Sequence, residues 1–251
     1  MPYATGLIPE EQRTRILNVH VGVGPLGGGA AERNYRLAAH LLAAQEYVSM
    51  LMTDKWLVNG ELSDGYAFPR ERLMILPLIN DRYDIPLPML GIIDRAVEIA
   101  DVIHIIGYAS PMVSLVCAAA RRKRKPWVVC TAGLLPLRGR SLPLKKAFQA
   151  VWGQRILRDA ARLIAITVDE MTAIAPYASS SGKVVLLPNA VDVPPLASDS
   201  GSREPKTSHS SPYLLFMGGF HPTKGADLLI DSAGRPSCPG NTGPNRGHDA
   251  V

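Results

Sequence analysis

The sequence has few cysteines, no long apolar run and no cluster of metal-binding residues, so it lacks the usual signals of disulfides, a membrane span or a metal centre. Its three cysteines, Cys117, Cys130 and Cys238, are odd in number and lack redox spacing, so we expect unpaired thiols in a reducing, cytoplasmic compartment. No apolar run approaches the roughly 18 residues of a spanning helix, and the polar N-terminus predicts no secretory signal. Neither an Asp-x-Asp pair nor a His or Cys cluster occurs, so we expect no metal site.

Acidic residues are scarce in one region. Residues 121–162 hold twelve Arg and Lys and a single acid, whereas residues 46–101 hold five bases and ten acids. Such polarity favours an anionic partner, such as phospholipid head groups or a nucleotide sugar. Nucleic acid also carries the right charge, but no recognition motif accompanies the bases, so we expect no nucleic-acid partner. The alternative for residues 121–125 is a helix end, where cations complement the carbonyl dipole.

Apolar segments alternate with amphipathic ones along most of the chain. We expect short apolar strands at 15–23, 47–53, 72–79, 101–106, 127–131, 162–166, 183–188 and 213–219. Helices are expected between them, at 30–44, 89–100, from Pro111, at 142–160, from Val168 and at 224–233. This order predicts an α/β fold, a Rossmann-like parallel sheet with helices on both faces. Ligands of such sheets bind beyond the carboxyl ends of the strands.

Composition divides the chain into four parts. Residues 1–192 carry the alternating pattern and predict the Rossmann-like domain, while residues 193–211 are rich in Pro and Ser and predict a linker. Residues 212–233 predict the start of a second domain, and residues 234–251 lack periodicity and predict a disordered tail. The segment after the linker is too short for a domain of ordinary size. We interpret the second domain as incomplete, with a frameshift and premature stop as the leading hypothesis.

The segment VGVGPLGGGAAERN at residues 21–34 has the G-x-G-x-x-G spacing of a dinucleotide fingerprint. That fingerprint needs a helix that opens within the motif and an acid about 20 residues further on. Each glycine costs about 1 kcal/mol in a helix interior, so we expect the helix to begin after Gly29. The second strand ends late, at Asp54. Both points argue against a dinucleotide, and the glycines predict a loop whose backbone N–H groups approach another phosphate.

Several segments resemble one known family in their order along the chain. GPLGGGAAERN, DVIHIIGYASP, ILRDAARLIAITVDE, VVLLPNAVD and LLFMGGFHPTKGADLLIDSA follow the order seen in family 4 glycosyltransferases of the GT-B fold, over residues 15–233. The resemblance implies two Rossmann-like domains across a cleft, with the acceptor on the N-terminal one and the nucleotide-sugar donor mainly on the other. It further implies retention of anomeric configuration, without a cofactor or metal ion.

The resemblance also implies roles for single residues. Gly28 and Gly29 would approach the donor diphosphate, and Lys224 would reach the same phosphates from the second domain. The alternative for Lys224 is a capping residue in a surface turn. No catalytic residue is assigned.

On the acceptor side, the resemblance implies contacts from Gly107, Tyr108 and Gly133. It implies the same for His104, whose alternative is a buried structural histidine. Glu32 and Arg33 would touch acceptor hydroxyls, and Glu32 would alternatively complement the helix N-terminus.

The chain departs from the family pattern at several positions. Gly219 stands where many members have Arg, Ala132 where many have His, and Ala190 where the usual residue is Gly. The paired glutamates of the second domain have no counterpart. We therefore expect no turnover by the chain alone.

The expected helix at 142–160 is basic and amphipathic, with Lys145, Lys146, Arg155 and Arg158 among apolar residues. It predicts contact with an anionic membrane, which suits a lipid-linked acceptor; the alternative is packing on the sheet with solvated charges. The function implied by the resemblance is hexosyl transfer from a nucleotide sugar to a glycan or lipid-linked acceptor, as in polysaccharide biosynthesis. The alternatives are a non-catalytic acceptor-binding or regulatory domain and a nucleotide-dependent oxidoreductase.

Overall fold

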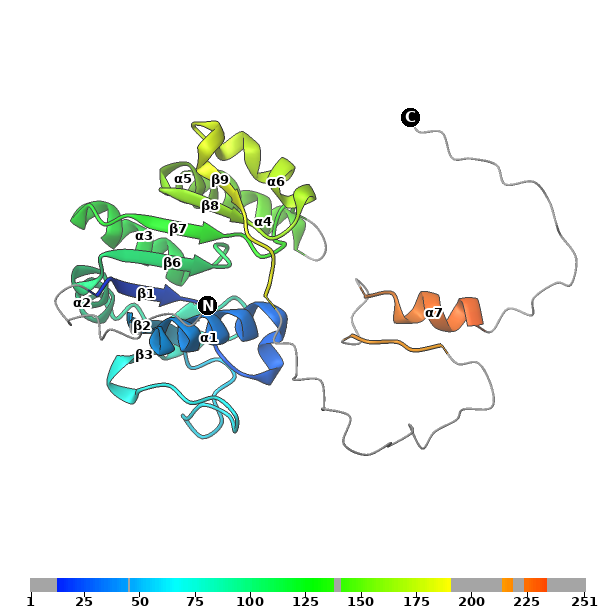
Figure 1. The fold of residues 1–251 in the computed structure, drawn as a ribbon, viewed down its shortest axis with the longest axis horizontal. Helices are drawn as coiled ribbons and strands as arrows, with labels where there is room; N and C mark the ends of the chain where they lie inside the picture. Colours follow the sequence, from blue (N-terminus) through cyan, green and yellow to red (C-terminus); the bar gives the residue numbers. More distant parts are fainter. Residues whose placement is uncertain (1–12, 45, 138–140, 191–213, 219–223, 234–251) are drawn as a thin grey trace, which may run out of the picture. The chain divides into compact units, whose positions relative to one another are not determined.

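The computed structural model divides into two compact units, Met1–Asp192 and Val193–Val251. It describes residues 13–44, 46–137, 141–190, 214–218 and 224–233. The first unit carries a seven-stranded sheet with its helices, and the described part of the second carries one helix (Figure 1). The predicted linker at 193–211 and the predicted tail at 234–251 lie outside the described residues.

The sheet of the first unit is parallel throughout, with the order β3-β2-β1-β6-β7-β8-β9. Its strands are β1 (Arg15–Val19), β2 (Tyr47–Thr53), β3 (Leu73–Leu76), β6 (Val102–Ile106), β7 (Trp127–Cys130), β8 (Arg162–Ala165) and β9 (Val184–Leu186). The expected α/β fold with a parallel sheet is confirmed. Because β2 and β6 flank β1, the strand order reverses there, which is the point where ligands of such sheets bind.

Two apolar cores lie on opposite faces of this sheet. In β2, Leu51 belongs to the larger core and its neighbours Met50 and Met52 belong to the smaller one, as alternation along a strand requires. The larger core is covered by α2 (Leu90–Ile99), α3 (Pro111–Lys123), α5 (Gln154–Asp159) and α6 (Val168–Ile174). The smaller core is covered by α1 (Gly28–Ala43), seen in blue in Figure 1.

Two predicted elements are interrupted in the structure. The strand expected at 72–79 ends as β3, and the chain continues into a separate antiparallel hairpin, β4 (Leu78–Asn80) with β5 (Ile85–Pro86). The helix expected at 142–160 is α4 (Leu142–Phe148), a π-helical turn at Gln149–Gly153 and then α5.

The π turn has a local cause. The Gln149 side chain turns inward, where its Oε1 accepts a hydrogen bond from the Tyr108 hydroxyl at 2.7 Å. A Cβ atom on Gly153 would lie 2.3 Å from that Oε1, so only glycine leaves room for the buried amide.

In the second unit, the described residues form α7 (Ala226–Ala233), inside the helix expected at 224–233. The strand expected at 213–219 is not formed in its described part, residues 214–218. A strand needs a neighbouring strand to bond its backbone groups, and the described part of this unit holds none.

The glycine loop differs from the prediction in one respect. The structure has α1 begin at Gly28, directly after a 3₁₀ turn at Pro25–Gly27, and not after Gly29. This removes one of the two arguments against a dinucleotide loop. Packing supplies a reason for the glycine spacing itself, because a Cβ on Gly22 would lie 2.5 Å from the Lys55 carbonyl oxygen.

Gly27 and Gly29 lead to opposite expectations for alanine substitution. A Cβ on Gly27 would lie 2.4 Å from the Ala31 Cβ, whereas a Cβ on Gly29 would meet nothing within 4 Å. We expect Gly27→Ala to lower the free energy of unfolding by about 1–3 kcal/mol. Gly29→Ala should leave it unchanged or raise it by up to about 1 kcal/mol. Urea denaturation followed by circular dichroism measures both, and equal effects would contradict this difference in packing.

Candidate functional site

The N-terminus of α1 is open at the carboxyl edge of the sheet. Gly28 and Gly29 are exposed, and no heavy atom lies within 4 Å of where their Cβ atoms would be. Gly28 has a φ of 65°, a conformation that favours glycine. No acidic residue lies in the first turn. The first N–H groups of the helix, which have no acceptor within it and no side-chain cap, and the positive end of the helix dipole therefore face a surface that an anionic group can approach closely.

A polar layer lies beneath α1, on the face of the smaller core. Asn18 of β1 and His104 of β6 are neighbours in register, and the His104 Nδ1 bonds the Asn18 Oδ1 at 2.7 Å. Asn34 of α1 is fully buried. Within the described residues, the Asn18 Nδ2 and both amide atoms of Asn34 have no hydrogen-bond partner. Asn18 and His104 thus form a buried polar pair on a largely apolar sheet, and Asn34 is a further buried polar side chain on the helix above it.

His104 is neutral in this setting. Burial, and next to it the Arg33 guanidinium, lower its pKa to about 4. Because Asn18 Oδ1 is an acceptor, the Nδ1 of His104 carries the proton and its Nε2 holds the lone pair. A pKa this low makes a weak base at neutral pH, so the side chain suits accepting a hydrogen bond. The contact of His104 with the sugar acceptor stays a prediction.

Arg33 and Glu32 point to different parts of the unit. The Arg33 Nη1 donates to the Asn189 Oδ1 at 2.7 Å, which joins α1 to the segment after β9. The Glu32 Oε2 accepts from the Tyr66 hydroxyl at 2.6 Å, and its Oε1 pairs with Arg36. The hydrogen bond to Glu32 raises the pKa of Tyr66 to about 12. Glu32 thus ties α1 to the loop after β2, while Arg33 lies at the carboxyl edge.

Gly107 and Tyr108 end β6 in different ways. Gly107 has a φ of 73° and turns the chain, with its N–H bonded to the Cys130 carbonyl at 2.9 Å. Tyr108 is fully buried in the larger core, and its hydroxyl donates to Gln149. The turn at Gly107 directs the Tyr108 side chain into the core, and its contact with a sugar acceptor stays a prediction. Gly107 itself remains at the edge.

The loop that carries Gly133 is held by a buried carboxylate. Ala132 and Gly133 have φ values of 51° and 80°. Glu170 Oε1 accepts from the Thr131 hydroxyl and from the Gly133 N–H, the latter at 2.6 Å, and Oε2 accepts from the Ile166 N–H at 2.8 Å. Glu170 thereby joins the loops after β7 and β8. It keeps two consecutive residues in the left-handed region.

In the sequence, Glu170 is readable only as the last residue of a capping box that begins at Thr167. Half of that box is present, since the Thr167 hydroxyl accepts from the Glu170 N–H at 3.2 Å. The longer contacts carried no sequence signal, because Thr131 and Gly133 lie 39 and 37 positions away. Asn18 was also missed, although a single polar residue inside the apolar segment RILNV is a readable signal.

The basic residues at the end of α3 are largely paired with acids. Lys123 pairs with Asp94 at 2.9 Å, Arg121 pairs with Asp159 at 2.5 Å, and Arg122 also contacts Asp94. Arg124 caps the helix in a left-handed conformation. This supports the helix-end interpretation for residues 121–125.

Other expectations concern scattered positions. Lys224 is exposed and lies two residues before the start of α7 in the second unit. Cys117 and Cys130 are free and buried, and Cys238 lies outside the described residues. Across the described residues, no group of three or more His, Cys, Asp or Glu is placed to hold a metal ion. No helix in that part of the chain is long and apolar enough to cross a membrane.

Comparison with known families gives a match that begins at the first residue of α1. The glycosyl transferase 4-like domain matches residues 28–190, which include the open helix terminus, Asn34 and His104 of the polar layer, and the Glu170 loop. The chain belongs to this family. The expected relation to family 4 glycosyltransferases is confirmed, and the first unit is a glycosyltransferase-like domain. No curated protein sequence matches the chain.

Among solved structures, Anabaena HepE in complex with UDP-glucose is 16% identical, with a TM-score of 0.47, over 72% of this chain and 45% of that one. A UDP-N-acetylglucosamine 2-epimerase from Rickettsia bellii is 12% identical, with a TM-score of 0.46, over 68% and 44%. An alpha-glucosyltransferase in complex with UDP and DNA is 12% identical, with a TM-score of 0.43, over 72% and 43%. The chain thus spans less than half the length of each of these proteins.

Removal of the buried carboxylate should destabilise the glycosyltransferase-like domain. We expect Glu170→Ala to lower the free energy of unfolding by about 2–3 kcal/mol, because it leaves buried donors without a charged acceptor. Asp169→Ala, at the exposed neighbouring position, is the control and should change stability by no more than about 0.5–1 kcal/mol. Urea denaturation compares the two variants, and equal losses would show that Glu170 has no special role in the loop.

The low pKa of His104 makes stability depend on pH. Its pKa is about 4 in the folded chain and 6.5 when unfolded, so between these values only the unfolded state takes up a proton. The free energy of unfolding should fall as the pH drops from 6.5 to 4, by on the order of 3 kcal/mol from this group.

We expect His104→Gln to remove that contribution and flatten the profile. His20, whose pKa is also lowered by burial, accounts for part of what remains. His40→Gln, on the exposed side of α1, is the control. Thermal denaturation at stepped pH measures the slope, and an unchanged slope in His104→Gln would contradict a neutral buried histidine.

Proposed function

We propose that the chain is the acceptor-side part of a glycosyltransferase that moves a hexosyl group from a nucleotide sugar to a glycan or lipid-linked acceptor. In this reaction the bond from the sugar C1 to the diphosphate breaks, a bond from C1 to an acceptor hydroxyl oxygen forms, and the hydroxyl proton is lost. Retention of anomeric configuration and independence of metals and cofactors are part of the proposal. It rests on one observation, the family match that opens on the exposed glycines of α1.

On the donor side, we propose that Gly28 and Gly29 let the backbone N–H groups of α1 contact the diphosphate. The open space at both positions and the absence of a side-chain cap at this end of α1 support this assignment. Lys224 is proposed as a further phosphate contact, as a point charge. The solved structures named above include proteins in complex with UDP or UDP-glucose, and UDP is accordingly the first nucleotide to test.

On the acceptor side, the proposed contacts are His104, Arg33, Gly107 and Gly133, and Glu32 through its position on α1. A neutral His104 with a free Nε2 lone pair can accept a hydrogen bond from a sugar hydroxyl. We further propose that the chain acts in polysaccharide synthesis at the cytoplasmic face of a membrane. There the basic surface of α4 would meet anionic lipids.

Nucleotide binding tests the donor assignment directly. Gly29 and Gly91 are matched positions, because each is the second residue of its helix and each has no heavy atom within 4 Å of the Cβ position. We expect Gly29→Leu to weaken the binding of UDP and UDP-glucose at least about tenfold, because its side chain blocks close approach of phosphate. Gly91→Leu should leave binding unchanged.

Isothermal titration of the full chain measures both variants. Equal affinity for Gly29→Leu and the unchanged chain would overturn the assignment of α1. Binding of acceptor glycans with no binding of any nucleotide sugar would instead favour the alternative, a non-catalytic acceptor-binding domain.

A further inference from the structure

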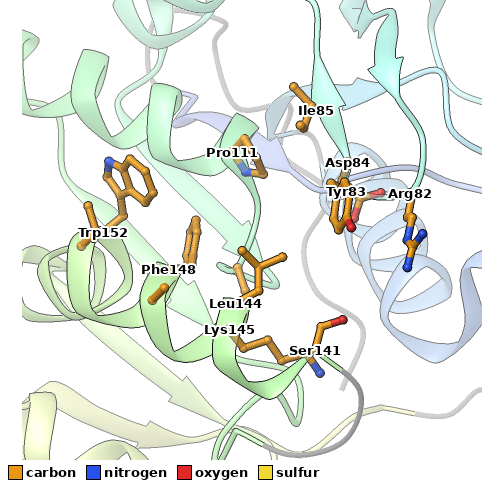
Figure 2. Close-up of a pocket in the computed structure, with 13 residues that line it drawn as sticks. Arg82, Tyr83, Asp84, Ile85, Pro111, Ser141, Leu144, Lys145, Phe148 and Trp152 are labelled. Carbon is orange, nitrogen blue, oxygen red and sulfur yellow. The ribbon is translucent and has the colours of Figure 1, made fainter.

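A pocket of about 690 Å³ lies beside the carboxyl edge of the sheet, within the first unit. Its size falls in the ~300–1,000 Å³ range of small-molecule sites. Figure 2 shows Leu144, Phe148 and Trp152 along one side of it, with Tyr83 and Ile85 from the β4–β5 hairpin opposite and Pro111 of α3 nearby. The lining is mainly aromatic and aliphatic. Nothing in the proposed donor or acceptor contacts accounts for it.

The apolar lining is exposed to an unusual degree. Leu144 is 53% exposed, Val151 60% and Trp152 53%. Large side chains that gather at a surface in this way mark a binding site more often than isolated ones do. The rings of Phe148 and Trp152 lie 5.7 Å apart and form one wall.

The π turn builds this wall. Gln149 is drawn inward by its hydrogen bond with Tyr108, and Gly153 leaves room for it. The same turn carries Val151 and Trp152 on its outer side. A π-helical turn interrupts the regular α-helical hydrogen bonding, and such turns are frequent at functional sites. The apolar wall is therefore a product of the same buried contact that shapes the core.

The charges at the pocket are mainly positive. Arg82, Asp84 and Lys145 are its charged lining residues. The Asp84 carboxylate is paired with Lys55 at 2.5 Å. Lys55 does not line the pocket, and its positive charge offsets the negative charge of Asp84. The Arg82 guanidinium lies over the Tyr83 ring, 5.4 Å from its centre. Arg82 and Lys145 thus give an apolar pocket a cationic rim.

An apolar cavity with a cationic rim matches an anionic amphiphile. We propose that this pocket holds the hydrocarbon chain of a lipid phosphate, with its phosphate at Lys145 and Arg82. Ala109 lines the pocket two residues after Gly107, so the head of such a lipid would lie toward the proposed acceptor contacts. The inference rests on the proposed function and deepens it, because it assigns the acceptor to the lipid-linked class.

Alkyl phosphates of increasing chain length are the direct probe. Octyl, decyl and dodecyl phosphate, each below its micelle concentration, are titrated into the full chain. Each buried methylene should tighten binding about fourfold until the pocket is full. Inorganic phosphate, which has the charge without the chain, should bind at least about a hundredfold more weakly than decyl phosphate. Octyl glucoside, which has the chain without the charge, should bind more weakly than octyl phosphate.

Substitutions locate the site. Trp152→Ser and Leu144→Ser should each weaken the binding of decyl phosphate at least about tenfold. Two variants are used so that a folding defect in one of them does not decide the result. Lys145→Gln should reduce the preference for octyl phosphate over octyl glucoside. Val168→Ser is the control, because Val168 is 67% exposed on α6 and lies outside the pocket lining. Its affinity should equal that of the unchanged chain.

Three results would overturn the inference. Affinity that does not change with chain length would indicate a phosphate site alone, and equal effects of Trp152→Ser and Val168→Ser would place binding elsewhere. Concentration-dependent dimerisation in sedimentation that Trp152→Ser abolishes would make the wall an interface between copies. UDP titrations on the same samples separate this proposal from the proposed function. Loss of alkyl phosphate binding alone refutes the pocket, and absence of UDP binding alone refutes the donor assignment.

Discussion

The handedness of the crossovers between parallel strands is the constraint on which this structure depends. A right-handed crossover from β1 to β2 and another from β6 to β7 run in opposite directions along the sheet, so their helices cover opposite faces. Among the described helices, this places α1 against one core and α2, α3, α5 and α6 against the other. It also separates the connections that leave β1 and β6, and the open terminus of α1 lies where they part.

Polar groups in the interior depend on that arrangement. Asn18 and His104 occupy the sheet face under α1, and burial makes the histidine neutral. Glu170, by contrast, is buried with three donors around it. His104 is suited to accept a hydrogen bond from a ligand, whereas the Glu170 carboxylate already accepts hydrogen bonds that hold a loop. The two differ in the hydrogen bonds that surround them and not in depth of burial.

The hydrogen bond between Tyr108 and Gln149 connects the core with the surface. It holds Tyr108, a residue of the loop after β6, in the larger core. At the same time it opens the helix at Gly153 and turns an aromatic wall outward. One buried contact thus shapes both the end of β6 and the apolar pocket beside it.

The sequence by itself determined the α/β class and the order of strands and helices along the first unit, because hydrophobic periodicity is a local property. It also pointed to Gly28, Gly29 and His104 as site residues. Only the tertiary structure decided that Tyr108 is a core residue, that Glu170 holds the loop of Gly133 and that the glycine spacing serves packing against the loop after β2. Such contacts join residues far apart in the chain, and nothing in the local pattern encodes which partner a side chain meets.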